Sequence, residues 1–313
     1  MTDAIGYGLD PDLAEFQRRI MADYARLGSA TYPSRAHRRR VAEQVRARWA
    51  AGGPDMAETL ERSVDGIRVR LHRPTSEPDL PVLIYLHGGG WTLFSIDTHD
   101  RLMRDYAARS GWAVLGVDYS LSPEVRFPFA LDEIATVLGW LQQEGGDLGL
   151  DVRKLAIGGD SAGANLAIAS ALRLRDSGGP ALAGMLLNYG AFDTRRRPSH
   201  DSFGGAEYML DPDEMDGFWA DYLAPGHERD PLAVPMLAHV EGLPPAFLCI
   251  AQCDILADEN VEMAERLRQA GVEVDARVYA GAPHSFLEAA SISERAWKAI
   301  GDAADWLSRL ARR

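Results

Sequence analysis

The spacing of hydrophobic residues along the chain changes at the Gly-Gly-Pro break of residues 52–54. Upstream of this break, apolar side chains recur at three- and four-residue steps, as they do on one face of a helix. The first series consists of Leu13, Phe16, Ile20, Tyr24 and Leu27. Two such patterns between residues 10 and 51 predict that residues 1–53 form an N-terminal helical arm, which we interpret as part of a cap.

Downstream of the break, short apolar runs of strand-forming residues alternate with helical patterns. The expected strands are residues 67–71, 82–86, 113–117, 154–158, 184–189, 246–251 and 275–280. The expected helices lie near residues 97–110, 129–144, 162–176, 258–270 and 291–311. Because the later strands are apolar on both faces, the alternation predicts an α/β fold with a mostly parallel central sheet covered by helices on both faces. We expect residues 54–313 to form this catalytic domain.

One stretch, residues 192–235, contains no strand pattern but many proline, glycine and charged residues. A single helix within it is marked by Phe218, Trp219, Tyr222 and Leu223. We interpret the stretch as a cap insertion, a lid that lies beside a catalytic edge of the sheet and packs on the N-terminal arm.

The composition is that of an ordinary globular protein, with 313 residues of which 46% are hydrophobic and 25% are charged. No apolar run approaches the roughly 18 residues that a membrane span needs, so we expect no membrane partner. The net charge of −13 disfavours nucleic acid, whose phosphates require a positive face. Six arginines crowd residues 35–48, and we interpret them as a solvated helix face rather than a nucleic-acid patch.

The start of the chain, Met1–Gly6, lacks the basic and apolar segments of a secretory signal. The chain has only two cysteines, Cys249 and Cys253, at and just after the end of an expected strand. We interpret both as small buried side chains without redox chemistry. These features predict a cytoplasmic location.

Ser161 is the central residue of a Gly-Asp-Ser-Ala-Gly sequence. It lies between the expected strand that ends at residue 158 and the expected helix that begins at residue 162. A Gly-x-Ser-x-Gly turn in this context strains the serine backbone and exposes the hydroxyl. The pattern is typical of the nucleophile elbow of an acyl-transferring enzyme, so Ser161 is the candidate nucleophile.

A candidate acid and a candidate base follow the last two expected strands: Asp254 and His284. The chain order Ser161, Asp254, His284 is the order of a catalytic triad built on the strand ends of an α/β-hydrolase sheet. Asp258 is the alternative acid, but we expect it to cap the following helix.

The remaining histidines do not have the spacing of helical metal ligands. His99 lies in an acidic run that is typical of a helix start. We therefore expect neither a metal nor a cofactor.

A glycine run, Gly88–Gly90, follows His87 and the expected strand 82–86. The N–H groups of such a loop can converge on one point and stabilise an oxyanion. We expect His87 to support the loop rather than to act as a base. A phosphate-binding loop is the alternative interpretation, but the run lacks the Gly-Lys-Ser/Thr ending of such loops.

Over residues 58–312 the chain resembles the hormone-sensitive-lipase-like (family IV) branch of the α/β-hydrolases, and within it the bacterial acetyl esterases. The resemblance rests on the motifs His87–Trp91, Gly159–Gly163, Asp118–Glu124 with Phe127 and Pro128, and the loops of Asp254 and His284. The chain departs from residues common in that branch at Ser120, Ala164, Ile255 and Ser285.

The resemblance implies an oxyanion hole formed by the N–H groups of Gly88, Gly89, Gly90 and Ala162. His87 and Asp160 would then support the two motifs. It further implies a serine carboxylesterase that prefers short acyl chains, from acetyl to butyryl or hexanoyl. The aromatic residues that we expect to line its substrate pocket are Trp91, Tyr189, Phe218 and Trp219.

Two other functions remain open at this point. The same triad can serve an amidase or formamidase, and the same fold can serve a non-catalytic small-molecule receptor. The expected partner is a small ester substrate. A homodimer through the edge strand at residues 275–280 is a further expectation.

Overall fold

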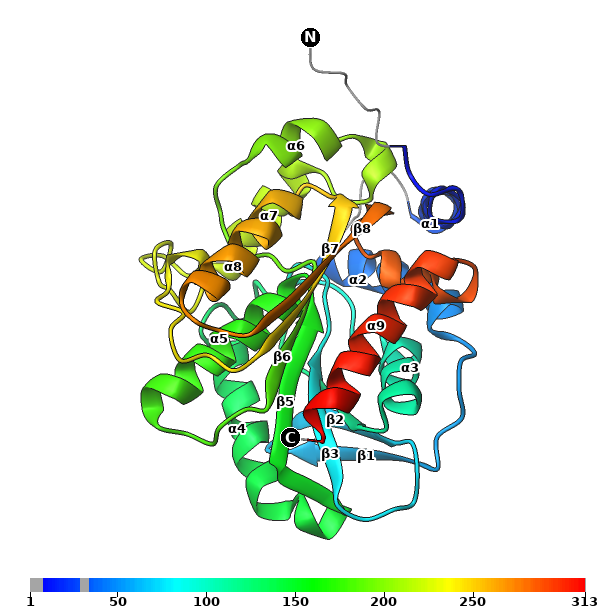
Figure 1. Ribbon diagram of the computed structural model, residues 1–313. Coiled ribbons are helices and arrows are strands. Elements are labelled where there is room, and N and C mark those ends of the chain that lie inside the picture. The colour runs from blue at the N-terminus through cyan, green and yellow to red at the C-terminus, as the bar shows by residue number, and fades with distance from the viewer. Residues whose placement is uncertain (1–7, 29–33, 313) are drawn as a thin grey trace.

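Eight strands form one sheet through the middle of the molecule within residues 8–28 and 34–312, the part of the chain that the computed structural model describes (Figure 1). The strands are β1 (Glu58–Val64), β2 (Ile67–Arg73), β3 (Leu80–Leu86), β4 (Ala113–Asp118), β5 (Leu150–Asp160), β6 (Gly184–Asn188), β7 (Ala246–Cys253) and β8 (Val274–Pro283). Their spatial order is β1-β2-β4-β3-β5-β6-β7-β8. The strand β2 is antiparallel to both neighbours and every other pair is parallel, which confirms the predicted sheet.

All seven expected strands are present, and one strand was not expected. The unexpected strand is β1, in which only Val64 is buried. It pairs with β2 alone, at the edge of the sheet, so most of its side chains face solvent and leave no apolar run in the sequence. The strand β5 begins at Leu150, four residues before the expected position; residues 151–154 are partly or fully exposed, so they leave no apolar run in the sequence.

Helices cover both faces of the sheet (Figure 1). They are α1 (Pro11–Leu27), α2 (Arg35–Ala50), α3 (Asp100–Ser110), α4 (Phe129–Glu144), α5 (Ala162–Ser177), α6 (Pro198–Phe203), α7 (Pro212–Tyr222), α8 (Ala257–Gln269) and α9 (Glu294–Leu310). Short 3₁₀ turns are η1 (Gly146–Leu148), η2 (Ala206–Tyr208), η3 (Pro235–Leu237) and η4 (Phe286–Ser291).

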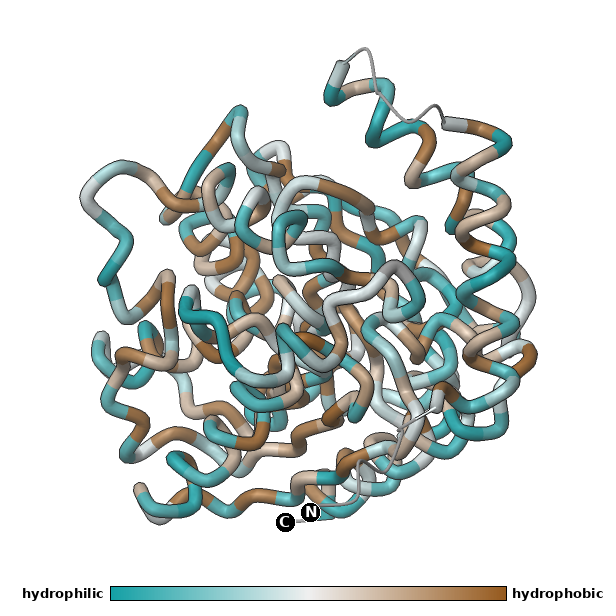
Figure 2. The backbone as a smooth tube through the Cα atoms, turned by 90° about the horizontal axis from the view of Figure 1, so that it is seen from above, coloured by the Kyte–Doolittle hydropathy of each residue, from teal (hydrophilic) through white to brown (hydrophobic). Residues whose placement is uncertain are grey.

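Successive residues of the central strands point to opposite faces of the sheet, and each set joins a different core. In β3, Val82 and Ile84 pack with the core that includes α4, α5 and α8, whereas Leu83 and Tyr85 pack with the core that includes α3 and α9. Figure 2 shows the hydrophobic segments mainly in the interior and the hydrophilic segments mainly outside. The carboxyl ends of the parallel strands are left for the loops that carry the site.

The N-terminal helices and the insertion after β6 lie next to each other above this end of the sheet. Two ion pairs connect α2 to α7: Arg35 lies 3.1 Å from Asp221, and Arg38 lies 2.7 Å from Glu214. The helices α1 and α2 are joined through the edge-to-face contact of Phe16 with Trp49. The insertion holds two helices, α6 and α7, where the sequence predicted one.

The arginines of residues 35–48, a segment that the structure describes completely, are mostly paired with acids. The pairs are Arg35 with Asp221, Arg38 with Glu214, Arg39 with Glu124, Arg46 with Glu288 and Arg48 with Asp23. Our interpretation of the segment as a solvated face is wrong for Arg46, which is only 5% exposed.

Several expectations concern features outside the site. Cys249 and Cys253 are buried free thiols of β7, as expected for apolar packing. None of the described helices is both long and apolar enough to span a bilayer. The strand β8 does lie at the sheet edge, but the homodimer and the cytoplasmic location stay predictions. The segment Met1–Gly6 lies outside the described residues.

Candidate active site

Ser161 occupies the sharp turn between β5 and α5, where its backbone has φ 54° and ψ −117°. This strained conformation is one that non-glycine residues rarely adopt. The turn packs tightly against β3, since a β-carbon at Gly163 would lie 1.9 Å from the carbonyl oxygen of Leu86. The N–H of Ser161 donates to the carbonyl of Asn188 at the end of β6 (2.9 Å). The sequence prediction of an elbow at Ser161 therefore agrees with the backbone geometry.

His284 and Asp254 follow the ends of β8 and β7. The side chain of Asp254 contacts His284, and the side chain of His284 contacts Ser161. The Nε2 atom of His284 lies 3.0 Å from the Oγ atom of Ser161, and its Nδ1 atom lies 2.7 Å from the Oδ2 atom of Asp254. The other carboxylate oxygen of Asp254 accepts the N–H of Leu256 (3.0 Å). A hydroxyl in such a chain can lose its proton to the imidazole and act as a nucleophile.

The alternative acid, Asp258, contacts a different segment, the start of α6. Its carboxylate accepts the N–H of Ser199 at the start of α6 (2.8 Å). It also does not cap α8 as we expected, because the N-cap residue is Leu256 and Asp258 belongs to the first turn of the helix. The preference for Asp254 over Asp258 therefore agrees with the geometry, although the reason given for it was wrong.

The pKa of His284 is set by two opposing effects. Burial disfavours the charged imidazolium and lowers the pKa, but the charge of Asp254 and its hydrogen bond favour it. The second effect prevails, so the pKa of His284 is raised above 6.5. The pair is thus arranged to stabilise the imidazolium that forms when the histidine takes a proton.

The glycine loop after β3 faces the same space as Ser161. Gly89 has φ +111°, and a β-carbon there would lie 2.3 Å from the carbonyl oxygen of Leu93. Among the described residues, the N–H groups of Gly89 and Gly90 have no hydrogen-bond acceptor. The N–H of Ala162 lies in the first turn of α5, where helix N–H groups have no partner in the helix. These N–H groups are therefore available to donate hydrogen bonds to an oxygen atom of a ligand.

Gly88 has a different environment from the next two glycines. A β-carbon at Gly88 would lie 2.4 Å from the Oδ2 atom of Asp160, so this glycine packs directly on the carboxylate that precedes Ser161. It does not line the cavity, whereas Gly89 and Gly90 do.

His87 is buried and supports the glycine loop from behind. Its ring stacks on Tyr119 with centroids 4.3 Å apart, and its Nδ1 atom lies 2.8 Å from the carbonyl oxygen of Gly88. Burial, with the nearby His99, lowers the pKa of His87 to about 3. A neutral imidazole held away from Ser161 matches the expected supporting position.

Asp160 accepts a hydrogen bond from the hydroxyl of Tyr85 (2.9 Å) and forms an ion pair with His99. Burial raises the pKa of Asp160, but His99 and Tyr85 outweigh burial and the net pKa is lowered. His99 does precede α3 as its N-cap residue, yet it makes no side-chain cap bond. Its contact with Asp160 is a site feature that the sequence pattern did not indicate.

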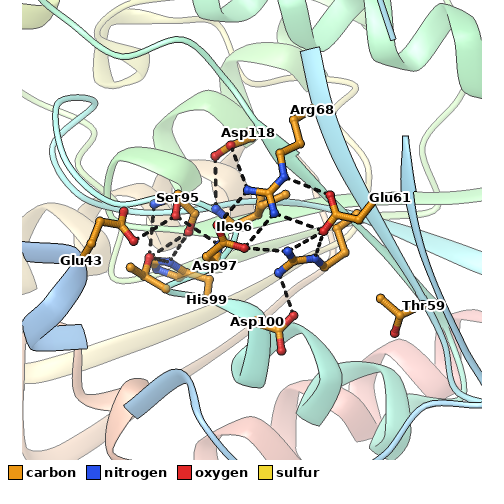
Figure 3. A network of polar contacts seen from close by, with 12 residues as sticks. Glu43, Thr59, Glu61, Arg68, Ser95, Ile96, Asp97, His99, Asp100 and Asp118 are labelled. Carbon is orange, nitrogen blue, oxygen red and sulfur yellow. Dashed lines mark hydrogen bonds and ion pairs between the residues drawn. The ribbon is translucent and has the colours of Figure 1, made fainter. Parts of the chain in front are cut away.

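A network of charged side chains anchors the segment that carries His99 (Figure 3). Arg68 of β2 donates to both Glu61 of β1 and Asp97, and Asp118 accepts the N–H of Ile96 (3.3 Å). The loop between the glycine run and α3 is therefore fixed to the antiparallel edge of the sheet.

A cavity of about 420 Å³ lies over Ser161 and His284. Its lining comes from α1, α2, the glycine loop, the insertion and the His284 loop: Ile20, Met21, Tyr24, Arg38, Ala42, Arg46, Gly89, Gly90, Leu93, Phe94, Ser161, Gly205, Met209, Leu210, Asp211, Glu214, Met215, Phe218, His284 and Ser285. A volume of this size is typical of small-molecule sites. No group of three or more potential metal-ligating side chains is found among the described residues.

Of the four aromatic residues expected in the pocket, Phe218 lines the cavity and the other three do not. Trp91 stacks on Tyr222 with centroids 4.2 Å apart and contacts Trp219, so both tryptophans pack the insertion onto the glycine loop. Tyr189 packs edge-on against His284 with centroids 5.1 Å apart. The prediction is wrong for Trp91, Trp219 and Tyr189 because a single sequence does not show which way a buried ring faces.

The cavity also contains residues that sequence reasoning missed. Arg38 and Arg46 of α2 and Glu214 of α7 line it. The arginines were visible as a cluster, but only the fold shows that α2 turns part of this cluster towards Ser161.

Two positions where the chain departs from the resemblance lie next to Asp254 and His284 in the sequence. Ser285 has φ 58°, a conformation that glycine adopts without strain, and it lines the cavity. Ile255 is fully buried, and its carbonyl accepts the hydroxyl of Ser199. Neither residue disrupts the contact between His284 and Asp254.

Known proteins are similar to this chain over most of its length. A family model described as the alpha/beta hydrolase fold matches residues 83–288. An ethyl acetate hydrolase of Pseudomonas putida is 36% identical over 306 residues, which cover 92% of this chain and 95% of that protein.

Solved structures of esterases are also similar to this chain over most of its length. A hyperthermophilic esterase from Pyrobaculum calidifontis superposes with a TM-score of 0.90 at 31% identity, covering 98% of this chain and 100% of that chain. A thermostable carboxylesterase cloned from a metagenomic library superposes with a TM-score of 0.85 at 33% identity, covering 88% and 97%.

Proposed function

The chain belongs to the α/β-hydrolase family, among its hormone-sensitive-lipase-like esterases, and on this premise we propose that it hydrolyses short-chain acyl esters through an acyl-enzyme. It is a carboxylic ester hydrolase. The proposal for its mechanism is carried by one observation, the hydrogen-bonded series Asp254, His284 and Ser161 at the floor of the cavity.

In the first step, Ser161 attacks the ester carbonyl while His284 accepts its proton. The 3.0 Å distance between Nε2 and Oγ is within the range for direct proton transfer. Asp254 holds the ring in the correct orientation and stabilises the imidazolium. The imidazolium then gives its proton to the leaving alkoxide, which departs as the alcohol.

The negative charge that develops on the carbonyl oxygen needs donors that are already in place. The N–H groups of Gly89, Gly90 and Ala162 are proposed to supply them, and their lack of other acceptors supports this role. Gly88 acts through packing on Asp160 rather than as a donor, which refines the expectation for the glycine run.

In the second step, water attacks the acyl-enzyme. His284, neutral again, takes the proton from that water, and the same donors stabilise the second oxyanion. Collapse of this intermediate returns the proton to Ser161 and releases the carboxylic acid.

The preference for short acyl chains is supported by the size of the cavity. Its volume of about 420 Å³ has to hold both the acyl and the alcohol parts of the ester. We propose that residues 1–53 and 192–235 form a cap over it, since Ile20, Met21 and Phe218 of these segments line the cavity.

The proposal is tested by steady-state hydrolysis of p-nitrophenyl esters from acetate to laurate. The expected result is a kcat/KM that is highest from acetate to hexanoate and falls by octanoate. A kcat/KM that rises up to laurate would contradict the short-chain preference. A matched anilide should react far more slowly than its ester, whereas an equal or faster rate would favour an amidase.

The role of Ser161 is tested with Ser161→Ala, which should retain less than about one thousandth of the rate. Ser170→Ala is the matched control, because Ser170 lies on the same helix α5 and donates only to the carbonyl of Leu166. A burst of p-nitrophenol in the first turnover would demonstrate the acyl-enzyme. Full activity of folded Ser161→Ala would refute the mechanism.

A further inference from the structure

Arg46 is a buried cation in the wall of the cavity that contains Ser161 and His284. It projects from α2, and only 5% of the residue is exposed. Its Nε and Nη1 atoms are shielded from solvent and have no hydrogen-bond partner among the described residues. A ligand in the cavity can therefore reach the guanidinium at Nη2, for which no hydrogen bond is found among the described residues.

The contacts of Arg46 fix its position without satisfying its donors. The guanidinium lies over the ring of Phe94, with 5.0 Å from its central carbon to the ring centroid, and Phe94 also lines the cavity. Glu288 lies 3.3 Å from the Nη1 atom, but the pair lacks hydrogen-bond geometry and the Oε2 atom of Glu288 is itself without a partner. Burial raises the pKa of Glu288, and the charge of Arg46 opposes this effect.

The other arginine of the cavity is already occupied. Arg38 donates to Glu214 across a distance of 2.7 Å. The two arginines therefore differ in what they can offer to a substrate, because the Nη2 atom of Arg46 has no hydrogen-bond partner among the described residues. A guanidinium donor of this kind binds a carboxylate through a charge-assisted hydrogen bond, which is stronger than a bond between neutral groups.

From these contacts we propose that Arg46 is a specificity-determining residue that selects esters carrying a second group, a carboxylate, within the cavity. The inference rests on the proposed esterase function and names its substrate class more closely. Whether the carboxylate belongs to the acyl or to the alcohol part of the ester is decided by the two arms of the experiment.

The acyl arm compares p-nitrophenyl hexanoate with the p-nitrophenyl half-ester of adipic acid, which has the same chain length. The alcohol arm compares phenyl acetate with 3-acetoxybenzoate. In each arm the quantity measured is the kcat/KM of the carboxylate ester divided by that of its neutral partner. Comparing this ratio between variants cancels the intrinsic reactivity of the two esters.

Arg46→Met should lower the ratio about tenfold or more in at least one arm, as expected for loss of a charge-assisted hydrogen bond. Arg46→Lys should lower it less, because lysine keeps the charge but not the fork. Arg48→Met is the matched control: Arg48 lies on the same helix and over the ring of Trp49, but it pairs with Asp23 and does not line the cavity. It should leave the ratio unchanged.

Glu288→Gln changes the counter-charge and should act in the opposite direction, raising the ratio severalfold. This variant carries the test if Arg46→Met does not fold. A ratio unchanged by Arg46→Met in both arms, in a protein that hydrolyses the neutral esters, would overturn the assignment of Arg46. So would a ratio unchanged by Glu288→Gln. Absence of Ser161-dependent hydrolysis of the neutral esters would instead contradict the proposed function itself.

Discussion

The Nε2 atom of His99 lies 3.3 Å from the Oδ1 atom of Asp160, the residue that immediately precedes Ser161. The other oxygen of Asp160 packs against Gly88, where a β-carbon would lie only 2.4 Å away. One carboxylate therefore contacts the serine turn, the glycine loop and the residue before α3. Asp160 thus connects the segment that precedes α3 to the glycine loop beside Ser161.

Asp160→Asn should lower the free energy of unfolding by about 3 kcal/mol, because it leaves His99 buried without its counter-charge. Urea denaturation measures this difference. Asp132→Asn is the control, since Asp132 forms an exposed ion pair with Arg173 and should cost less than about 1 kcal/mol. Equal costs for the two variants would show that the buried pair does not contribute to stability.

The cost of Asp160→Asn should depend on pH. The pKa of Asp160 is lowered from 3.8, so its stabilising contribution is present above that value and is lost as the pH falls through the folded-state pKa. The pKa of His99 is raised from 6.5, because Asp160 outweighs burial, so its contribution is present below that value and is lost as the pH rises through the folded-state pKa. The difference between the proteins should be largest between these two values and shrink on either side.

The positions of Ser161, Asp254 and His284 could be predicted because each is tied to a local pattern. Buried parallel strands are continuous apolar runs, and the residues after them gather at one edge of the sheet. The Gly-x-Ser-x-Gly turn adds a backbone constraint that only a strand-to-helix junction satisfies. Local sequence patterns were therefore sufficient to predict these three residues, whose side chains lie within hydrogen-bonding distance of one another in series.

The contacts of Arg46 and His99 could not be predicted in this way. Arg46 meets Glu288 from a distant part of the sequence, and His99 meets Asp160 from a different strand connection. Their side chains also contradict the local pattern, because an arginine-rich helix and an acidic helix start both usually face solvent. Tertiary packing decides the burial of such residues. The same reason explains why Trp91 and Trp219 were wrongly placed in the pocket.

The pH dependence of activity should reflect the raised pKa of His284. The histidine must be neutral to accept the proton of Ser161, and a raised pKa keeps it protonated to a higher pH. The kcat/KM for p-nitrophenyl butyrate should therefore rise with pH through a transition above 6.5, measured from pH 5 to 9. A transition well below 6.5 would contradict the effect assigned to Asp254.

Asp254→Asn should reduce kcat by about 10⁴-fold, as in other triads where the acid is replaced by its amide. It should also move the transition towards lower pH, because burial remains and the charge that opposed it is gone. Asp258→Asn is the matched control and should alter neither quantity much, since Asp258 contacts Ser199 instead. A larger loss in Asp258→Asn than in Asp254→Asn would reverse the assignment of the acid.

Alanine substitutions at Gly89 and Gly90 should differ in whether a second substitution, Phe218→Ala, restores the lost activity. A β-carbon at Gly90 would lie 2.2 Å from the ring of Phe218, whereas a β-carbon at Gly89 would meet the backbone carbonyl of Leu93. Each alanine substitution should lower kcat/KM by about 10²-fold or more, because it displaces an oxyanion donor.

Phe218→Ala should recover much of the activity lost in Gly90→Ala, because it removes the colliding ring and φ +58° is a left-handed conformation that alanine can adopt at modest cost. It should recover none of the activity lost in Gly89→Ala, where the clash is with main chain and φ is +111°. A double-mutant cycle on p-nitrophenyl acetate measures both couplings, with Phe218→Ala alone as the reference. Equal coupling at the two glycines would show that Phe218 of the insertion does not pack on the glycine loop.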